Sequence, residues 1–258
     1  MRIIIILLFG TLGLSGCSEK SNWELQWSDE FDYTGAPNPE IWDYETGFIR
    51  NNELQYYTKD EVNVRVENGM CILTARLENQ DSITSASINT RGKMDFLYGR
   101  IEIRAKIPSA LGTWPALWLL GINISEMGWP ACGEIDIMEH VGFDPDVIHA
   151  NIHTKAYNHT IKTNRGAKIN VTDPWTDYHI YALEWFEDRM DLFLDDSLYF
   201  SYDNDLADND DTWPFDKPHY LLMNLAYGGS WGGQQGVDTG KLPQQFEIDY
   251  VRYYKEKE

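Results

Sequence analysis

Three carboxylates fall within six residues of this chain, at Glu134, Asp136 and Glu139. Acidic and apolar residues alternate through the first part of this run, which indicates a β-strand, because successive strand side chains point to opposite faces. A regular strand would turn Glu139 into the protein interior, where an unpaired carboxylate is costly. One extra residue in a β-bulge around Ile137 and Met138 returns Glu139 to the acidic face. We therefore predict three carboxylates on one face of a bulged strand.

This spacing allows a specific chemistry. With one residue absorbed by the bulge, Glu134 and Glu139 are about four strand steps, or roughly 13 Å, apart at the backbone. Two extended side chains that lean inward cover about 7–8 Å of that span, so their carboxyl groups approach to roughly 5–5.5 Å, where one acid attacks a sugar and the other donates a proton. Asp136 lies between them, close enough to hydrogen-bond Glu134. Three carboxylates this close require at least one raised pKa, as a general acid does. A solvated acidic edge strand is the alternative, but it does not explain the apolar partners.

The run from Glu134 to Glu139 also resembles the catalytic motif of glycoside hydrolase family 16, in the bulged form that laminarinases and related β-glucanases carry. The resemblance extends from about Trp27 to Tyr254. It implies that Glu134 is the nucleophile, Glu139 the acid/base and Asp136 their helper. It further implies an all-β jelly-roll sandwich of two curved antiparallel sheets with a concave substrate cleft. The implied activity is that of a retaining endo-β-glucanase on β-1,3-glucan or mixed-linkage β-1,3-1,4-glucan, with no catalytic cofactor.

Short strand-like runs recur along the chain, and no segment shows the pattern of a long amphipathic helix. Turn residues at 67–69 and 195–196 predict two hairpins. Many short antiparallel strands favour a sandwich or jelly roll. Because no linker or repeat follows Asn22, residues 23–258 are predicted to form a single catalytic domain.

Tryptophans are predicted to bind the sugar rings. Trp114 and Trp118 are four residues apart in a second stretch that resembles the family, so on a strand they share one face beside the carboxylates. An indole that stacks on the apolar face of a sugar buries area and leaves the hydroxyl groups free. A pair of core tryptophans is the alternative. Trp231, in a glycine-rich loop, is predicted to border the cleft, and Trp129 to add a contact at its rim.

Two polar residues are further substrate-binding candidates. Asn52 lies in an Asn-Asn-Glu-Leu-Gln-Tyr-Tyr segment that resembles the family, and amides suit hydroxyl groups that both donate and accept. Its alternative role is a polar turn that caps a strand. Arg91 is predicted either to hydrogen-bond the substrate or to brace the acids.

Histidines flank the acidic strand and its predicted neighbour. His149 and His153 are four residues apart, which suggests a metal site, but no third ligand lies nearby in the sequence. We instead predict that His153 lies in the cleft, either near Asp136 or at the plus subsite, and that His149 serves in packing. His140 should point away from the cleft if Glu139 points into it.

A structural calcium ion is a second implication of the resemblance. The aspartate at the position of Asp249 often binds Ca²⁺ in the family, together with backbone oxygens near Glu30 and Gly69. Such a set of oxygen ligands suits this ion. The alternative is that Asp249 forms an ion pair with Arg252 or another base.

The N-terminus has the form of an export signal. Residues 1–16 combine a basic start with an apolar run too short for a membrane helix. Leu-Ser-Gly-Cys, ending at Cys17, resembles a bacterial lipobox, which implies cleavage before this cysteine and a lipid on its sulfur. Residues 17–22 would then be a tether to an envelope membrane, expected to be the outer one, on a face that the sequence does not specify. An ordinary signal peptide that contains a cysteine is the alternative.

Composition limits the partners. Lys and Arg number 21 against 41 Asp and Glu, a formal charge of -20, which argues against nucleic acid and strongly anionic polysaccharides. A neutral β-glucan fits better, and we expect a monomer. Cys71 and Cys132 are predicted to be buried free thiols, with a disulfide as the alternative. Two other functions stay open on the same scaffold: a noncatalytic glycan-binding lipoprotein, and a galactanase that cuts agarose or carrageenan.

Overall fold

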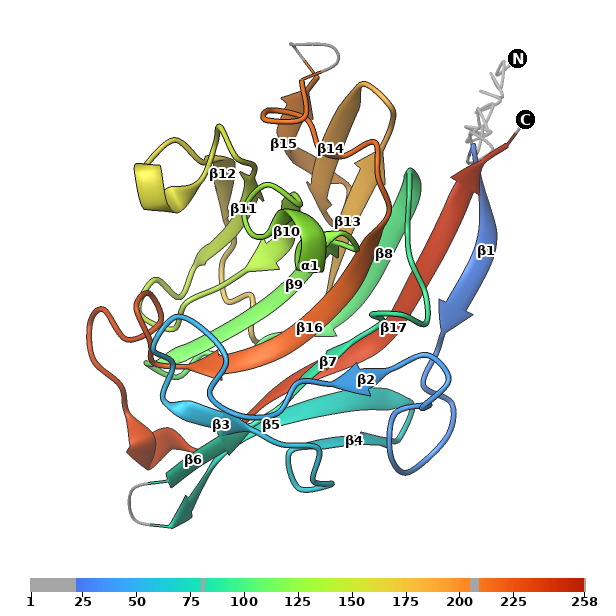
Figure 1. Cartoon of the computed structure of the whole chain (residues 1–258). Helices are drawn as coiled ribbons and strands as arrows, with labels where there is room; N and C mark the ends of the chain where they lie inside the picture. Colours follow the sequence, from blue (N-terminus) through green and yellow to red (C-terminus); the bar gives the residue numbers. More distant parts are fainter. Residues whose placement is uncertain (1–21, 80–81, 205–208, 258) are drawn as a thin grey trace, which may run out of the picture.

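The computed structural model describes residues 22–79, 82–204 and 209–257. Within them, seventeen strands form two largely antiparallel sheets that pack face to face (Figure 1). This arrangement confirms the predicted all-β jelly roll. The predicted signal segment, Cys17 and nearly all of the tether lie outside the described residues.

The smaller sheet has seven strands and carries the acidic segment. In spatial order it comprises β12 (Arg165–Asn170), β11 (Val147–His153), β10 (Glu134–Glu139), β9 (Thr113–Gly121), β16 (His219–Tyr227), β7 (Ser87–Asn89) and β2 (Asp43–Tyr44). The long strands β9 and β16 bend along their length, which makes the outer face of this sheet concave (Figure 1).

The larger sheet has ten strands and backs the smaller one. Its order is β15 (Ser197–Asp203), β14 (Arg189–Leu194), β13 (His179–Trp185), β8 (Gly99–Lys106), β17 (Gln244–Glu256), β5 (Met70–Asn79), β6 (Ser82–Ser85) and β3 (Gln55–Tyr57), with β1 (Trp23–Asp29) beside β17 and β4 (Val64–Glu67) beside β5. The described helices are short, namely α1 (Ile124–Met127) and the 3₁₀ turns η1 (His159–Ile161) and η2 (Thr239–Lys241). Among the described residues, no helix is long and apolar enough to cross a membrane.

Side-chain alternation in the smaller sheet, interrupted at the bulge in β10, separates the core from the cleft. On β9, Leu117 and Leu119 are fully buried between the sheets, whereas Trp118 faces the concave side. On β10, Ile135 is buried in the same core and Glu134 faces the cleft. The hydrophobic residues at every second position thus fill the interior, and their burial offsets the cost of placing acids on the same strand.

Local features of the fold agree with the sequence pattern. Asn68 and Gly69 both have positive φ in the β4–β5 hairpin, and Asp195 does in the β14–β15 hairpin, as short hairpin turns require. Cys71 and Cys132 are buried free thiols, which confirms the prediction. Burial raises the pKa of the Cys132 thiol to about 12, so this thiol stays protonated at neutral pH.

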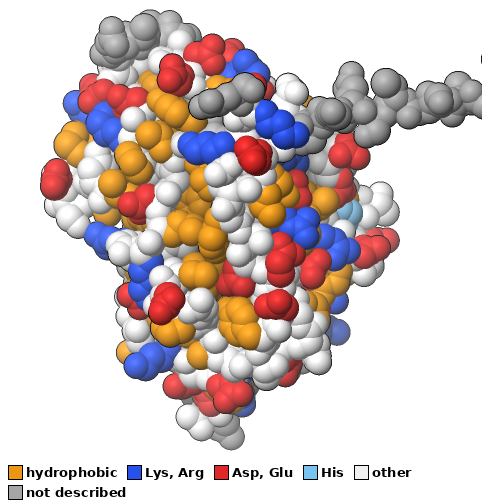
Figure 2. All heavy atoms as spheres, turned by 90° about the vertical axis from the view of Figure 1, so that its right-hand side faces the viewer, with side chains coloured by type: hydrophobic (Ala, Val, Ile, Leu, Met, Phe, Trp, Pro, Cys, Tyr) orange, Lys and Arg blue, Asp and Glu red, His pale blue; other side chains and the backbone are white. Residues whose placement is uncertain are grey.

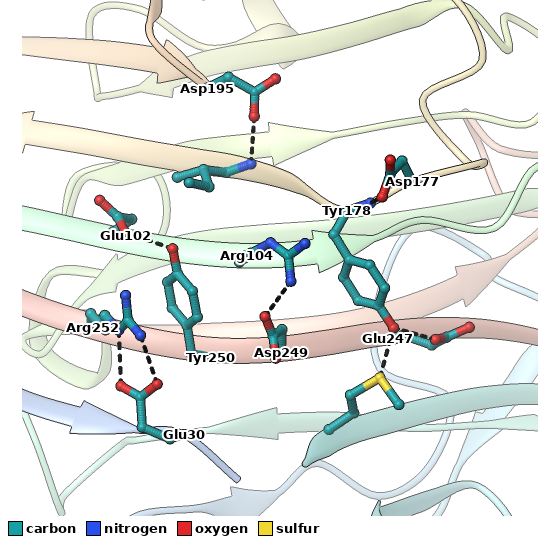
Figure 3. A network of polar contacts seen from close by, with 12 residues as sticks. Glu30, Glu102, Arg104, Asp177, Tyr178, Asp195, Glu247, Asp249, Tyr250 and Arg252 are labelled. Atoms are coloured by element: carbon teal, nitrogen blue, oxygen red, sulfur yellow. Dashed lines mark hydrogen bonds and ion pairs between the residues drawn. The ribbon is translucent and has the colours of Figure 1, made fainter. Parts of the chain in front are cut away.

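The residues predicted to hold calcium lie on the solvent side of the larger sheet. Asp249 pairs with Arg104, and Glu30 accepts two hydrogen bonds of 2.9 Å from Arg252 (Figure 3). Gly69 lies in the β4–β5 turn. Asp249 therefore forms the ion pair given above as the alternative, although its partner is Arg104. Because Arg104 already neutralises the one side-chain carboxylate of the predicted calcium site, Asp249 fits ion pairing better than Ca²⁺ ligation. The backbone oxygens near Glu30 and Gly69 are not engaged by these ion pairs, and calcium stays a prediction.

Charged side chains of both signs share this side of the molecule. Figure 2 shows basic and acidic groups interspersed over the side on which β1 and β17 lie. Arg100, for example, bridges Glu102 and Glu184 at 3.1 and 2.8 Å. Partly exposed pairs of this kind contribute little individually, on the order of 0–1 kcal/mol each.

Candidate active site

Strand β10 is bulged where the sequence predicts it. Its antiparallel register with β11 shifts between Asp136 and Glu139, and its register with β9 shifts between Asp136 and Met138. The extra residue brings Glu139 to the side on which Glu134 and Asp136 lie, and all three line one cleft. The predicted grouping of the carboxylates is therefore confirmed.

The cleft lies on the concave face of the smaller sheet and has a volume of about 830 Å³. Strands β9, β10, β11 and β16 form its floor, and loops at both ends form its walls. Its lining side chains are largely aromatic, amide and acidic: Arg50, Asn51, Glu53, Trp114, Ala116, Trp118, Leu120, Trp129, Glu134, Asp136, Glu139, His149, Asn151, His153, His159, Asn164, Asn224, Ser230, Trp231 and Gln234. This mixture suits a sugar polymer, with apolar ring faces and many hydroxyl groups.

Indole and amide N–H groups orient the two glutamates. The Trp129 indole donates to Glu134 at 3.0 Å, and the Trp114 indole donates to Glu139 at 3.0 Å. The Asn151 amide donates to the other oxygen of Glu139 at 3.2 Å. Each glutamate is thereby held at a fixed place before a substrate arrives, which is the preorganisation that catalysis requires.

Asp136 and His153 meet at the floor of the cleft, as predicted. His153 Nε2 lies 3.4 Å from Asp136 Oδ2 and 3.7 Å from Glu134 Oε1. Within the described part of the chain, these three side chains are the single group of acidic, histidine or cysteine residues with metal-ligand spacing, at 4.8 Å or less between ligand atoms. Because Glu134 and Asp136 are two of the predicted catalytic residues, an ion there would compete with the predicted chemistry.

Burial raises the pKa of all three carboxylates. The pKa of Glu134 rises to about 8, first because of desolvation and then because of the neighbouring negative charge of Asp136. Desolvation is also the main reason that the pKa values of Asp136 and Glu139 rise. The N–H donors and His153 lower the pKa of Glu139 and so partly offset this rise. A raised pKa favours the protonated form of a carboxyl group, as general acid catalysis requires. Because a pKa of about 8 leaves Glu134 largely protonated at neutral pH, its attack on a substrate requires that this proton first pass to Asp136 or Glu139.

Two aromatic side chains form the more exposed part of the predicted sugar platform. Trp114 and Trp231 line the cleft with their ring centroids 5.4 Å apart, edge to face. Trp118 lies on the same face as Trp114, as predicted, but only 8% of it is exposed. Its indole donates to Asn224 at 2.8 Å and the Arg50 guanidinium lies 5.0 Å over its ring. Trp118 is thus part of the floor.

Two predicted substrate-binding residues do not line the cleft. Asn52 is exposed, while its neighbours Asn51 and Glu53 face the cavity. Arg91 donates to Ser125 at 2.7 Å, away from the acids. The Asn52 prediction identified the correct segment and the wrong side chain, because a turn with positive φ at Asn51 and Asn52 decides which residues face inward. The Arg91 prediction is wrong for its segment as well, since no neighbour of Arg91 in the sequence lines the cleft.

The histidine predictions hold with one correction. His140 is fully buried and contacts the Pro145 carbonyl oxygen at 2.9 Å, away from the cleft. His149, predicted to serve in packing, packs edge-on against Trp231 at 5.0 Å but also lines the cleft. Its spacing of four residues from His153 on one strand was the signal for a shared face.

Several cleft residues were not predicted from the sequence. Arg50, Glu53 and Asn224 line the cavity. The Glu53 carboxylate is buried and accepts hydrogen bonds from the Gln55 amide at 2.7 Å and the Tyr57 hydroxyl group at 3.2 Å. The available signal was that Glu53 belongs to the polar segment that contains Asn52 and that Arg50 directly precedes this segment. Nothing in the local pattern around Asn224 distinguishes it from a core strand residue.

A jelly roll with a carboxylate pair on the floor of an aromatic-lined cleft defines a carbohydrate-cleaving hydrolase. Residues 50–252 match the model of glycosyl hydrolases family 16, and the chain belongs to this family. It is therefore a glycoside hydrolase of the retaining type.

Similar proteins agree with this assignment. A β-glucanase from Rhodothermus marinus is 50% identical, over 95% of this chain and 89% of its own length. The crystal structure of the laminarinase from Rhodothermus marinus superposes with a TM-score of 0.88, over 92% of this chain and 98% of that one. SCLam, a non-specific endo-β-1,3(4)-glucanase solved as a point mutant with a bound glucan oligosaccharide, is 46% identical, with a TM-score of 0.86 over 92% of this chain and 96% of that one.

Proposed function

We propose that this protein is a retaining endo-β-glucanase that hydrolyses internal β-1,3 bonds of glucan, or adjacent bonds in mixed-linkage β-1,3-1,4-glucan. The observation that carries the proposal is the bulge in β10, which presents Glu134, Asp136 and Glu139 together on the floor of the cleft. The similar proteins described above act on the same class of polymer according to their names.

The first half of the reaction forms a covalent intermediate. A Glu134 oxygen attacks the anomeric carbon, and the bond from that carbon to the bridging oxygen breaks. Glu139 transfers its proton to the bridging oxygen, so the departing chain leaves with a free hydroxyl group. Asp136, whose Oδ2 lies 3.4 Å from His153 Nε2, orients Glu134 and supports the proton on Glu139.

The second half of the reaction releases the sugar. Glu139, now ionised, takes a proton from water, whose oxygen bonds to the anomeric carbon while the ester bond to Glu134 breaks. Two successive inversions retain the β configuration. No cofactor enters either step.

Product analysis tests the substrate class. We expect the purified protein to release short oligosaccharides from laminarin, and from lichenan or barley glucan, with a rapid early fall in polymer length that marks internal cleavage. Agarose and carrageenan should not be cut. Activity on a galactan alone would replace the glucanase assignment by the galactanase alternative. Binding to laminarin without any new reducing ends would favour the noncatalytic alternative.

We also propose that the protein is a lipoprotein held at a bacterial envelope membrane, with the outer membrane as the expected site. The lipobox-like Leu-Ser-Gly-Cys that ends at Cys17, preceded by a short apolar run, supports this proposal. A single acyl chain anchors weakly and two or more anchor firmly, so loss of the cysteine should release the protein.

A Cys17→Ser variant tests the anchor. Expressed in a bacterial host, the parent should sediment with the membranes and be solubilised by detergent, whereas the variant should appear in the soluble fraction with unchanged specific activity. Equal membrane association of parent and variant would contradict lipidation at this residue. Cys71→Ser is the matched control, because that thiol is buried in the fold and should not affect membrane association.

A further inference from the structure

Ile137 is the residue that the β10 bulge leaves out of both neighbouring ladders. Neither β9 nor β11 places a residue opposite it, although both pair with Asp136 before it and with Glu139 after it. Ile137 is fully buried. A buried backbone carbonyl group that loses its ladder partner needs another donor, because leaving it unpaired is costly.

A tyrosine from the opposite sheet supplies that donor. The Tyr199 hydroxyl group donates to the Ile137 carbonyl oxygen at 3.1 Å. Tyr199 lies on β15, whose register with β14 also shifts. Leu198 and Phe200 each have a residue opposite them on β14, whereas Tyr199 has none opposite it there. Leu198 is 53% exposed, whereas Tyr199 turns inward and packs against the core. Two strand irregularities, one in each sheet, therefore meet at one hydrogen bond.

The phenol also lies close to the acids on the inner side of their strand. Burial raises the pKa of Tyr199, and the negative charges of Glu139 and Asp136 raise it further. The hydroxyl group thus stays protonated and able to donate throughout the range in which the acids titrate.

We propose that Tyr199 is a positioning residue of the hydrolase, whose hydroxyl group holds the bulge carbonyl of Ile137 and thereby sets the place of Glu139 on the cleft face. It acts through the backbone and does not touch the substrate. Glu139 follows Ile137 by two residues. If the hydrogen bond to the Ile137 carbonyl oxygen is lost, the peptide group after Ile137 is free to rotate, and this rotation displaces the Glu139 carboxyl group from the Trp114 indole. Small misplacements of a reacting group lower the rate strongly without weakening substrate binding.

The test is a Tyr199→Phe variant, assayed on laminarin. This inference rests on the proposed glucanase function, so the parent is assayed first: an inactive parent overturns the function and not the role of Tyr199. With an active parent, we expect kcat to fall about tenfold, KM to stay within about twofold, and the basic limb of the pH–kcat profile to move, because Glu139 changes its surroundings.

Two matched tyrosines separate positioning from stability. Tyr202→Phe, on the same strand, removes a hydrogen bond of 2.7 Å to the Thr212 carbonyl oxygen that does not involve the bulge. Tyr181→Phe removes a buried hydroxyl group without a hydrogen-bond partner among the described residues. Both should keep the parent's kcat and pH profile, whatever their thermal stability.

Replacement of Tyr199 by para-aminophenylalanine restores a donor and should recover most of the lost kcat. The proposal is overturned if Tyr199→Phe loses thermal stability as Tyr202→Phe does but keeps the parent's kcat and pH profile. If Tyr199→Phe does not fold, the para-aminophenylalanine variant decides alone: a kcat near that of the parent supports the proposal, and a tenfold loss with intact folding overturns it.

Discussion

Glu139→Gln lowers kcat on laminarin by about 10²–10⁴-fold, the range that a general acid contributes, and Glu134→Gln lowers it at least as much. Glutamine keeps the size of each side chain and its contacts with the indole donors, so both variants should fold as the parent does. The loss arises because an amide neither attacks the anomeric carbon nor delivers a proton at neutral pH. Reducing-end assays and circular dichroism on the purified variants check both halves of this expectation.

A substrate with an activated leaving group distinguishes the two glutamates. An aryl β-glucoside oligomer whose phenol departs without protonation should still form the glycosyl-enzyme in Glu139→Gln, giving a burst of phenol and then slow turnover. Glu134→Gln should give no burst, since it lacks the attacking oxygen. Glu40→Gln, at an exposed site outside the cleft, is the matched control and should behave as the parent. Near-parent turnover of laminarin by either cleft variant would refute the assigned roles.

Glu134→Gln should also make the protein more stable at neutral pH. The pKa of Glu134 is about 8 in the fold, against an ordinary value of 4.5. A group whose pKa is higher in the folded state than in the unfolded state stabilises the fold fully only below its unfolded pKa. This contribution to the free energy of unfolding is lost as the pH rises toward the folded-state pKa. At neutral pH the unfolded chain has ionised while the folded carboxyl group still holds its proton, a penalty on the order of 3 kcal/mol that glutamine avoids.

Urea unfolding of the parent and Glu134→Gln, measured from about pH 4 to pH 8, checks this expectation. The two proteins should have similar free energies of unfolding near pH 4, and the variant should gain steadily as pH rises. The control Glu40→Gln should show no such gain, because this exposed carboxylate stays in water. A pH-independent difference between the parent and Glu134→Gln, or a variant that is less stable at neutral pH, would contradict the burial of this charge.

The sequence predicts the central strand well because its pattern is local. The alternation of Glu134, Ile135 and Asp136 indicates one face for the acids, and the cost of burying Glu139 requires a bulge before it. Both features appear in the register of β10 with its neighbours. The position of His153 near Asp136 follows once β11 is paired with β10.

Loop residues could not be placed in the same way, because contacts between distant segments orient them. The Asn51 carbonyl oxygen accepts a hydrogen bond of 2.8 Å from the Ser230 amide, and Glu53 bridges to Gly228. These contacts turn Asn51 toward the cleft and leave Asn52 in solvent. Trp129 was expected only at the rim, and no local pattern predicts its hydrogen bond with Glu134.

The anomeric form of the first product tests the account most directly, because retention requires Glu134 and Glu139 to act from opposite faces of one sugar at close range. Proton NMR during rapid hydrolysis of laminarin oligosaccharides reports the configuration at the new reducing end before mutarotation changes it. We expect the β anomer to appear first and the α anomer to follow slowly. Initial formation of the α anomer would mean a single displacement by water, and would contradict the assignment of Glu134 as the nucleophile.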